Sequence, residues 1–190
     1  MYLRSEVAIT RRRFTRTEYY RMVEAGILGK RDQVELIRGE IVEKFPMSLR
    51  HRAFVMNLSQ LLIVRLAGRA RVSVYGAVAL TDDTDTEPDL ALLRLRAPSY
   101  KVREAYAEDA LLVIEVADAS LAYDRTTKLR FYAEAGIPEY WIVDCTTESV
   151  EVDRNPGPDG YRDVTRAANA AMVAPQAFAD VELTLAEIFA

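Results

Sequence analysis

The chain has 190 residues, half of them hydrophobic and 28% charged, which fits one globular domain that buries a core without disulfides or structural metals. Its single cysteine, Cys145, excludes an internal disulfide and a cysteine-rich zinc cluster, and favours a reducing, cytoplasmic setting. The sequence has neither an apolar run of membrane-spanning length nor the apolar stretch of a secretory signal at its start. The formal net charge of −4 argues against a protein that coats nucleic acid nonspecifically, although it leaves room for a nuclease with acidic catalytic groups.

The first third of the chain predicts helical and hairpin elements behind a loose arm. In chain order these are a flexible arm (1–13), a short helix (15–25), a hairpin (34–37 and 40–43) and a long helix (48–66). Thr15 and Glu18 form a capping box, which indicates where the short helix begins. Apolar residues at spacings of three and four predict the long helix.

The remaining sequence alternates strands and helices. The predicted elements are strands (72–75, 77–80), an acidic turn (81–86), a strand (90–93), a loop or partial helix (94–110), a strand (111–116), a helix (121–135), a strand (139–144), a hairpin (150–154, 161–165) and a short amphipathic tail (185–189). Residues 111–116 are almost continuously apolar, which predicts a central strand that is buried on both faces. This order is typical of a mixed α/β (α+β) fold, in which residues 14–190 form one domain with a central sheet flanked by helices.

Two carboxylates lie at the ends of strands that we expect to be neighbours. Glu115 lies near the end of the most hydrophobic strand, where a carboxylate is costly unless it is paired or binds a metal. Asp89 begins the preceding strand. If the two strands pair antiparallel, both carboxylates meet at one edge of the sheet. Two converging carboxylates with open water positions suit Mg²⁺ or Mn²⁺, so Asp89 and Glu115 are candidate metal ligands.

Lys128 is the third candidate, on the helix that follows the Glu115 strand. Such a helix packs back across the sheet, so its ammonium could orient an attacking water or stabilise charge in the transition state. Asp124 lies four residues earlier on the same helical face and is expected to hold Lys128 in place. Simpler readings stay open: Glu115 could form a buried pair with Lys128 or Arg130 and do nothing else, and Asp89 could cap a turn.

The sequence resembles the Uma-two family of restriction endonucleases, which belongs to the PD-(D/E)XK nuclease superfamily, over roughly residues 14–185. The motifs that carry the resemblance are Val113–Val116, Asp124–Leu129, Tyr132–Asp144, Pro88-Asp89, the hairpin segments Glu35–Ile37 and Gly39–Val42, and His51. The resemblance implies a restriction-endonuclease-like fold with a mixed core sheet and an N-terminal hairpin. It also implies Mg²⁺-dependent hydrolysis of DNA phosphodiester bonds.

The chain departs from the family pattern at three positions. The usual superfamily lysine, two residues after the acid, is replaced by Ala117, and Lys128 takes its place from the following helix. The family commonly has serine where this chain has Asp118, and aspartate where it has Arg38. Asp118 adds negative charge near Glu115, which could add a metal ligand or weaken phosphate binding.

Two further residues are candidates for supporting roles. A carboxylate from the N-terminal part often completes such sites in the superfamily, which makes Glu40 a candidate, although an ordinary half-exposed strand residue explains it equally well. His51, the only histidine, could act as a general base or contact phosphate, because histidine titrates near neutral pH. A polar first-turn residue of the long helix is an equally good explanation of His51.

The leading hypothesis is a Mg²⁺-dependent DNA endonuclease in which water attacks the phosphodiester in line. The alternative is a non-catalytic DNA-binding or assembly module with the same fold, and a third is a hydrolase of another phosphate ester. Because cutting both strands of a duplex takes two sites, a homodimer is possible. The apolar tail (181–189) could form its interface or cover the chain's own core.

Overall fold

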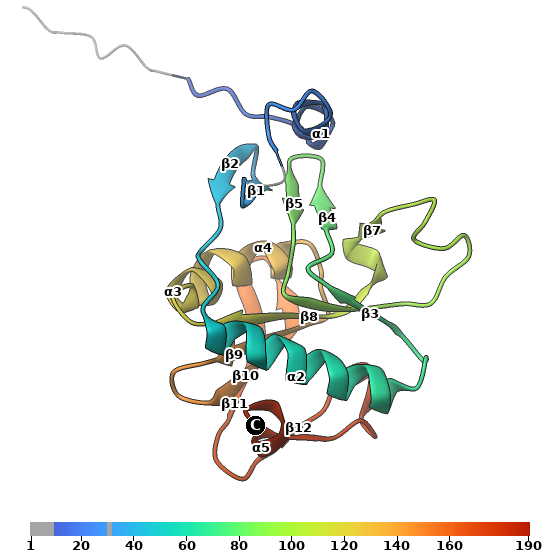
Figure 1. Cartoon of the computed structure of the whole chain (residues 1–190), viewed down its shortest axis with the longest axis vertical. Helices are drawn as coiled ribbons and strands as arrows, with labels where there is room; N and C mark the ends of the chain where they lie inside the picture. Colours follow the sequence, from blue (N-terminus) through green and yellow to red (C-terminus); the bar gives the residue numbers. More distant parts are fainter. Residues whose placement is uncertain (1–9, 30–31) are drawn as a thin grey trace, which may run out of the picture.

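The computed structural model describes residues 10–29 and 32–190, and its centre is a six-stranded mixed sheet (Figure 1). The strand order is β11-β10-β9-β8-β6-β3, and the strands are β3 (Arg71–Val74), β6 (Leu90–Leu93), β8 (Ala110–Ala117), β9 (Glu139–Asp144), β10 (Ser149–Gly157) and β11 (Gly160–Ala167). Strands β8 and β9 run parallel, and the other neighbours pair antiparallel. A parallel pair needs a crossover connection, which the helical segment between β8 and β9 provides.

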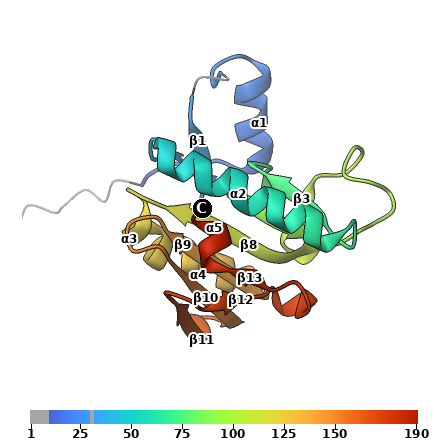
Figure 2. The same ribbon diagram turned by 60° about the horizontal axis from the view of Figure 1, so that its bottom comes forward.

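Helices cover both faces of this sheet, as Figure 2 shows for α2 (Leu49–Leu66) and α4 (Leu129–Glu134). Alternate residues of β8 belong to the two faces. Leu112 and Ile114 pack in the core under α2, whereas Val113 and Ala117 pack in the core under α4. The prediction that this strand is central and buried on both faces is therefore confirmed.

A second, five-stranded sheet carries the N-terminal hairpin. Its order is β2-β1-β5-β4-β7, and its strands are β1 (Val34–Ile37), β2 (Glu40–Glu43), β4 (Val78–Thr81), β5 (Thr84–Thr86) and β7 (Ala105–Tyr106). The predicted hairpin pairs as expected, but the acidic turn predicted over 81–86 is wrong in its second half. The turn needs only Asp82 and Asp83, and β5 is buried between β1 and β4.

Capping explains where the two longer helices begin. The hydroxyl of Thr15 accepts from the Glu18 amide at the start of α1 (Arg16–Glu24), which is the predicted capping box. Ser48 caps α2 in the same way, by accepting from the amide of His51. Of the predicted flexible arm, residues 1–9 lie outside the described residues, and residues 10–13 have no helix or strand.

The predicted helix over 121–135 is irregular. It consists of a single turn, α3 (Leu121–Tyr123), a π-helical turn over Asp124–Lys128, and then α4. π-helical turns are rare and occur frequently at functional sites. The predicted loop over 94–110 contains β7 and a 3₁₀ turn (Ala107–Asp109).

The C-terminal tail packs on the chain's own core. Val181, Leu183 and the helix α5 (Leu185–Ile188) bury their apolar side chains in the cluster under α2. Of the two fates expected for this tail, the structure shows the cover of its own core. Within the described residues, no helix is both long enough and apolar enough to cross a membrane.

Candidate active site

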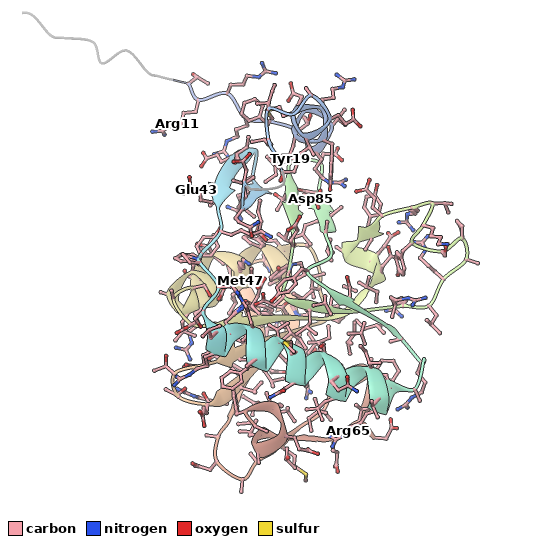
Figure 3. All side chains as sticks on the ribbon, in the orientation of Figure 1. Arg11, Tyr19, Glu43, Met47, Arg65 and Asp85 are labelled. Atoms are coloured by element: carbon pink, nitrogen blue, oxygen red, sulfur yellow. The ribbon has the colours of Figure 1, made fainter. Side chains whose placement is uncertain are left out.

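A cavity of about 330 Å³ opens between the N-terminal sheet, the start of α2, the end of β8 and the π-helical turn. Met47, labelled in Figure 3, lies where the chain enters α2 and belongs to the cavity wall. The ionisable side chains of the wall are mostly acidic: Glu35, Glu87, Asp89, Glu115, Asp118 and Asp124, with Lys44, Lys128 and His51. The cavity therefore suits a cationic ligand.

Strand register brings Asp89 and Glu115 together. Leu90 pairs with Ile114 across the antiparallel strands β6 and β8. Asp89 precedes Leu90 and Glu115 follows Ile114, so the two residues lie side by side. Two-residue alternation places both carboxylates on the face toward the π-helical turn. The Val116 amide donates to Asp89 Oδ2 at 2.8 Å, which fixes this carboxylate against β8. The expected meeting of the two carboxylates at one sheet edge is what the structure shows.

Lys128 reaches this pair from the π-helical turn. Its Nζ donates to Glu115 Oε1 at 2.8 Å and lies 3.8 Å from Glu35 Oε2. The Tyr132 hydroxyl donates to the same Glu115 oxygen at 2.8 Å. Lys128 therefore contacts Glu115 although it is not on the strand at position 117, because the crossover helix lies over the end of β8.

Asp124 does not hold Lys128 in the way that its spacing suggests. Among the described residues, no ion pair joins the two, and Asp124 Oδ2 instead accepts from Ser120 Oγ at 2.6 Å. The four-residue spacing aligns side chains in an α-helix, but this segment is a π-helical turn with a wider repeat. The predicted contact is therefore wrong, although Asp124 does line the cavity.

Burial and crowding of charge shift the pKa values of this cluster. Burial raises the pKa of Glu115 to about 8, and Asp89, Asp124 and Glu35 add to the rise while Lys128 opposes it. Burial also raises the pKa of Asp124 to about 6. Burial alone would lower the pKa of Lys128, but the Glu115 and Glu35 carboxylates outweigh it and raise that pKa, so the ammonium stays charged.

His51 joins the site from the opposite side. Its Nε2 lies 3.0 Å from Asp89 Oδ2, and its buried Nδ1 has no hydrogen-bond partner in the described part of the chain. His51 lies in the first turn of α2, where its amide donates to the N-cap Ser48, and its ring reaches Asp89 at the sheet edge. His51 is thus placed to orient Asp89.

Glu40 lies outside this group. It is exposed on β2, and its carboxylate is 3.5 Å from Arg13. The N-terminal carboxylate that does reach the cavity is Glu35, which is buried and accepts from the Glu87 amide at 2.8 Å. The signal for Glu35 was the same as for Glu115, a carboxylate within an apolar strand. Of the two readings of Glu40, the structure fits that of an ordinary exposed strand residue.

The cavity offers two carboxylate oxygens to a metal ion. In the described ranges, no group of three or more His, Cys, Asp or Glu residues is arranged to hold a metal ion. Asp89 Oδ1 and Glu115 Oε2 each make no hydrogen bond within those same ranges, and both residues line the cavity. Mg²⁺ is commonly bound by one or two carboxylates, water and substrate phosphate, so the two free oxygens fit such an ion.

Comparison with known proteins places the chain in a family. The model of the Uma2 family, described as "Putative restriction endonuclease", matches residues 16–186. The chain belongs to this family. Comparison with curated proteins gives no match. The resemblance noted from the sequence motifs is therefore confirmed.

A solved structure shares the fold of this Uma2 member. It is described as "a putative nuclease belonging to DUF820" from Anabaena variabilis ATCC 29413, and is 19% identical in sequence with a TM-score of 0.75. The match covers 93% of this chain and 97% of the Anabaena chain. The predicted fold, a mixed sheet flanked by helices, is confirmed.

Proposed function

We propose that this Uma2 member is a Mg²⁺-dependent endonuclease that hydrolyses phosphodiester bonds in DNA. The observation that carries the proposal is the pair Asp89 and Glu115, side by side in a cavity, each with one carboxylate oxygen that accepts no hydrogen bond from the described residues. The family and the Anabaena protein are both described as nucleases, which supports the reaction class.

The free oxygens Asp89 Oδ1 and Glu115 Oε2 are the groups that would hold the ion. When bound, Mg²⁺ supplies Lewis-acid stabilisation of charge on a phosphate oxygen. Lys128 would bring a second positive charge to the same place, because its ammonium has donors left after the bond to Glu115. His51 and the Val116 amide hold the other oxygen of Asp89, so that carboxylate is oriented before any ligand arrives.

The charge of the cavity supports a dependence of the proposed activity on a divalent cation. The wall holds six carboxyl groups against Lys44 and Lys128 in a small volume, so those that are ionised repel a phosphate backbone until a cation neutralises them. The two lysines, which pair with Glu87 and Glu115, cannot compensate all six groups. A second candidate function rests on the same observation: a nuclease-fold module that binds DNA elsewhere or assembles with other proteins would tolerate this acidic cavity without catalysis.

Calorimetric titration with Mg²⁺ and Mn²⁺ separates these functions. Asp89→Asn and Glu115→Gln should each lose metal binding and lower the cleavage rate of plasmid and single-stranded DNA by about 10²- to 10³-fold. Glu182→Gln, on an exposed side chain remote from the cavity, is the matched control and should change neither. A protein that binds no metal and cuts neither DNA nor RNA would instead be the non-catalytic module. Metal binding without nucleic-acid cleavage would direct the search to other phosphate esters.

A further inference from the structure

Three aromatic side chains, Phe45, Tyr75 and Tyr123, belong to the wall of the candidate active site and are called the aromatic rim below. Phe45 is 46% exposed, Tyr75 is 40% exposed, and Tyr123 is half-buried. Glu115 in the same wall is only 4% exposed, so the carboxylates are recessed and the rings lie nearer the solvent. Exposed aromatic side chains beside a cavity with a few polar groups are typical of ligand sites.

The aromatic rim reaches the site from two sides. Tyr75 follows β3, and its amide donates to the Asp89 carbonyl at 3.1 Å. Tyr123 ends α3, directly before the π-helical turn that carries Lys128. Phe45 joins Tyr123, with ring centroids 5.9 Å apart, where the segment between β2 and α2 passes beside α3 (Figure 1). The two candidate metal ligands therefore lie between rings on either side.

The backbone of Tyr75 is held in an unfavourable conformation. Its φ is +51°, in the left-handed region that bulky side chains rarely adopt. Strained residues of this kind cluster at binding and catalytic sites, where the surrounding structure holds them in place. Core packing does not explain this one, because the side chain stays exposed. The conformation is consistent with a ring that is kept at the cavity for a ligand.

The chemistry of the wall indicates which part of a DNA strand the rings would contact. The wall holds six carboxyl groups against Lys44 and Lys128, so phosphate contacts, which dominate the binding of duplex DNA, are weak here. Aromatic rings instead stack on the faces of bases, whatever the sequence. In a duplex, neighbouring base pairs cover those faces, and side chains reach only the base edges in the grooves. The aromatic rim therefore favours an unpaired base.

We propose that the cavity binds one unpaired nucleotide of single-stranded DNA, with its base stacked on the aromatic rim and its phosphate toward Asp89 and Glu115. The cavity volume of about 330 Å³ is at the lower end of the range for small-molecule sites, roughly 300–1,000 Å³, and suits one nucleotide rather than a double helix. This inference rests on the proposed function, because it names the substrate of the same site. Single-stranded DNA is then the preferred substrate over the duplex.

Fluorescence anisotropy of labelled DNA tests the proposal on the intact chain. The ligands are a strand of about 12 thymidines, an abasic strand of the same length and charge, and the thymidine strand in a duplex. Ca²⁺ replaces Mg²⁺, so that binding is measured apart from the proposed cleavage. The thymidine strand should bind at least about 10-fold tighter than the duplex, and about 5- to 100-fold tighter than the abasic strand, because stacking of one base contributes that much. Equal binding of the thymidine and abasic strands, or tighter binding of the duplex, overturns the proposal.

Variants of the aromatic rim separate stacking from apolar contact. Phe45→Leu and Tyr75→Leu keep apolar bulk but lose the aromatic face, so each should lower the affinity for the thymidine strand by about 5- to 100-fold. Tyr75→Phe keeps the ring and should bind like the parent. Tyr100→Leu, which removes an aromatic ring outside the cavity wall, is the matched control and should also bind like the parent. Circular dichroism verifies that each variant is folded. Leucine variants that bind as tightly as the parent overturn the role of the rings.

The proposed function and this inference fail in different ways. Binding of the thymidine strand that depends on the aromatic rim, without cleavage of any DNA in Mg²⁺, would remove the proposed function and leave this inference standing. Cleavage of duplex DNA that neither Phe45→Leu nor Tyr75→Leu affects would overturn this inference and leave the proposed function standing. Measuring binding and cleavage on the same set of variants therefore separates the two.

Discussion

Buried carboxylates occur at two ends of the central sheet, and they differ in how their oxygens are used. Glu139, at the start of β9, is fully buried and accepts from Trp141 Nε1 at 2.9 Å, from Arg154 Nε at 2.8 Å and from the Gln176 amide at 2.6 Å. Asp89 and Glu115, at the cavity, each keep one oxygen without a donor among the described residues. Burial alone therefore does not distinguish the candidate metal ligands from Glu139, whereas a free oxygen that faces the cavity does.

Asp153 on β10 is a third case. It is fully buried, and both of its oxygens lack hydrogen-bond partners in the part of the chain that the structure describes. It lies outside the wall of the cavity. Burial raises its pKa to about 7, so a proton rather than a ligand removes its charge. The four acids thus fall into three groups: protein donors satisfy Glu139, Asp89 and Glu115 keep a free oxygen at the cavity, and a proton neutralises Asp153.

Among the buried acids, the largest effect of a substitution on stability is expected at Glu139. Removing this carboxylate in Glu139→Ala leaves Arg154 and the Trp141 indole without their acceptor, and should lower the free energy of unfolding by about 3 kcal/mol, as for other broken buried pairs. Chemical denaturation measures the loss. Mg²⁺ affinity of the folded variant should be unchanged. If Glu139→Ala instead abolished metal binding at full stability, the division between the two ends of the sheet would be wrong.

The proton of Asp153 predicts a dependence of stability on pH. The folded-state pKa of about 7 exceeds the ordinary 3.8, so unfolding releases a proton and stability falls as pH rises between these values, then levels off. Asp153→Asn stays neutral throughout. Above pH 7 it should be more stable than the parent by on the order of 1–3 kcal/mol, and the gain should disappear toward about pH 4. Thermal unfolding across this range measures the difference, and Asp159→Asn, exposed in a hairpin turn, should show none.

A substitution of His51 tests how the free oxygen of Asp89 is positioned at the cavity. His51→Gln removes the ring nitrogen that holds Asp89 Oδ2 and leaves both candidate ligands in place. Outer partners of metal ligands typically contribute 10- to 100-fold in affinity, so we expect Mg²⁺ binding to weaken by about 10-fold or more while the protein stays folded. Calorimetry provides the measurement. An unchanged affinity would mean that the Val116 amide alone orients Asp89.

The sequence was sufficient where local patterns decide the outcome. The sequence placed Asp89 beside Glu115 on the condition that their two apolar strands pair antiparallel, and β6 and β8 do pair in this way. The crossover helix between parallel strands must lie over the sheet, which brings Lys128 to Glu115. These features depend on period, burial and connection rules, all of which can be read along the chain.

Tertiary packing decided the features that the sequence missed. The π-helical turn that separates Asp124 from Lys128 has no sequence signature, because an α-helix was equally compatible with the residues. In the N-terminal hairpin, Glu35 and Glu40 both alternate with apolar neighbours, and only the pairing of β1 with β5 shows which one is covered. Strand β5 itself is held by partners on both sides rather than by its own propensity.

The smallest effect is expected at Glu40, and it tests the choice between the two hairpin acids. Its exposed ion pair with Arg13 contributes little, so Glu40→Gln should change stability by less than about 0.5 kcal/mol and leave Mg²⁺ affinity and cleavage unchanged. Glu35→Gln is the matched variant: it keeps an acceptor for the Glu87 amide but removes the charge 3.8 Å from Lys128. Only Glu35→Gln should alter metal binding, because only that side chain reaches the cavity. The reverse result would return the fourth carboxylate of the site to Glu40.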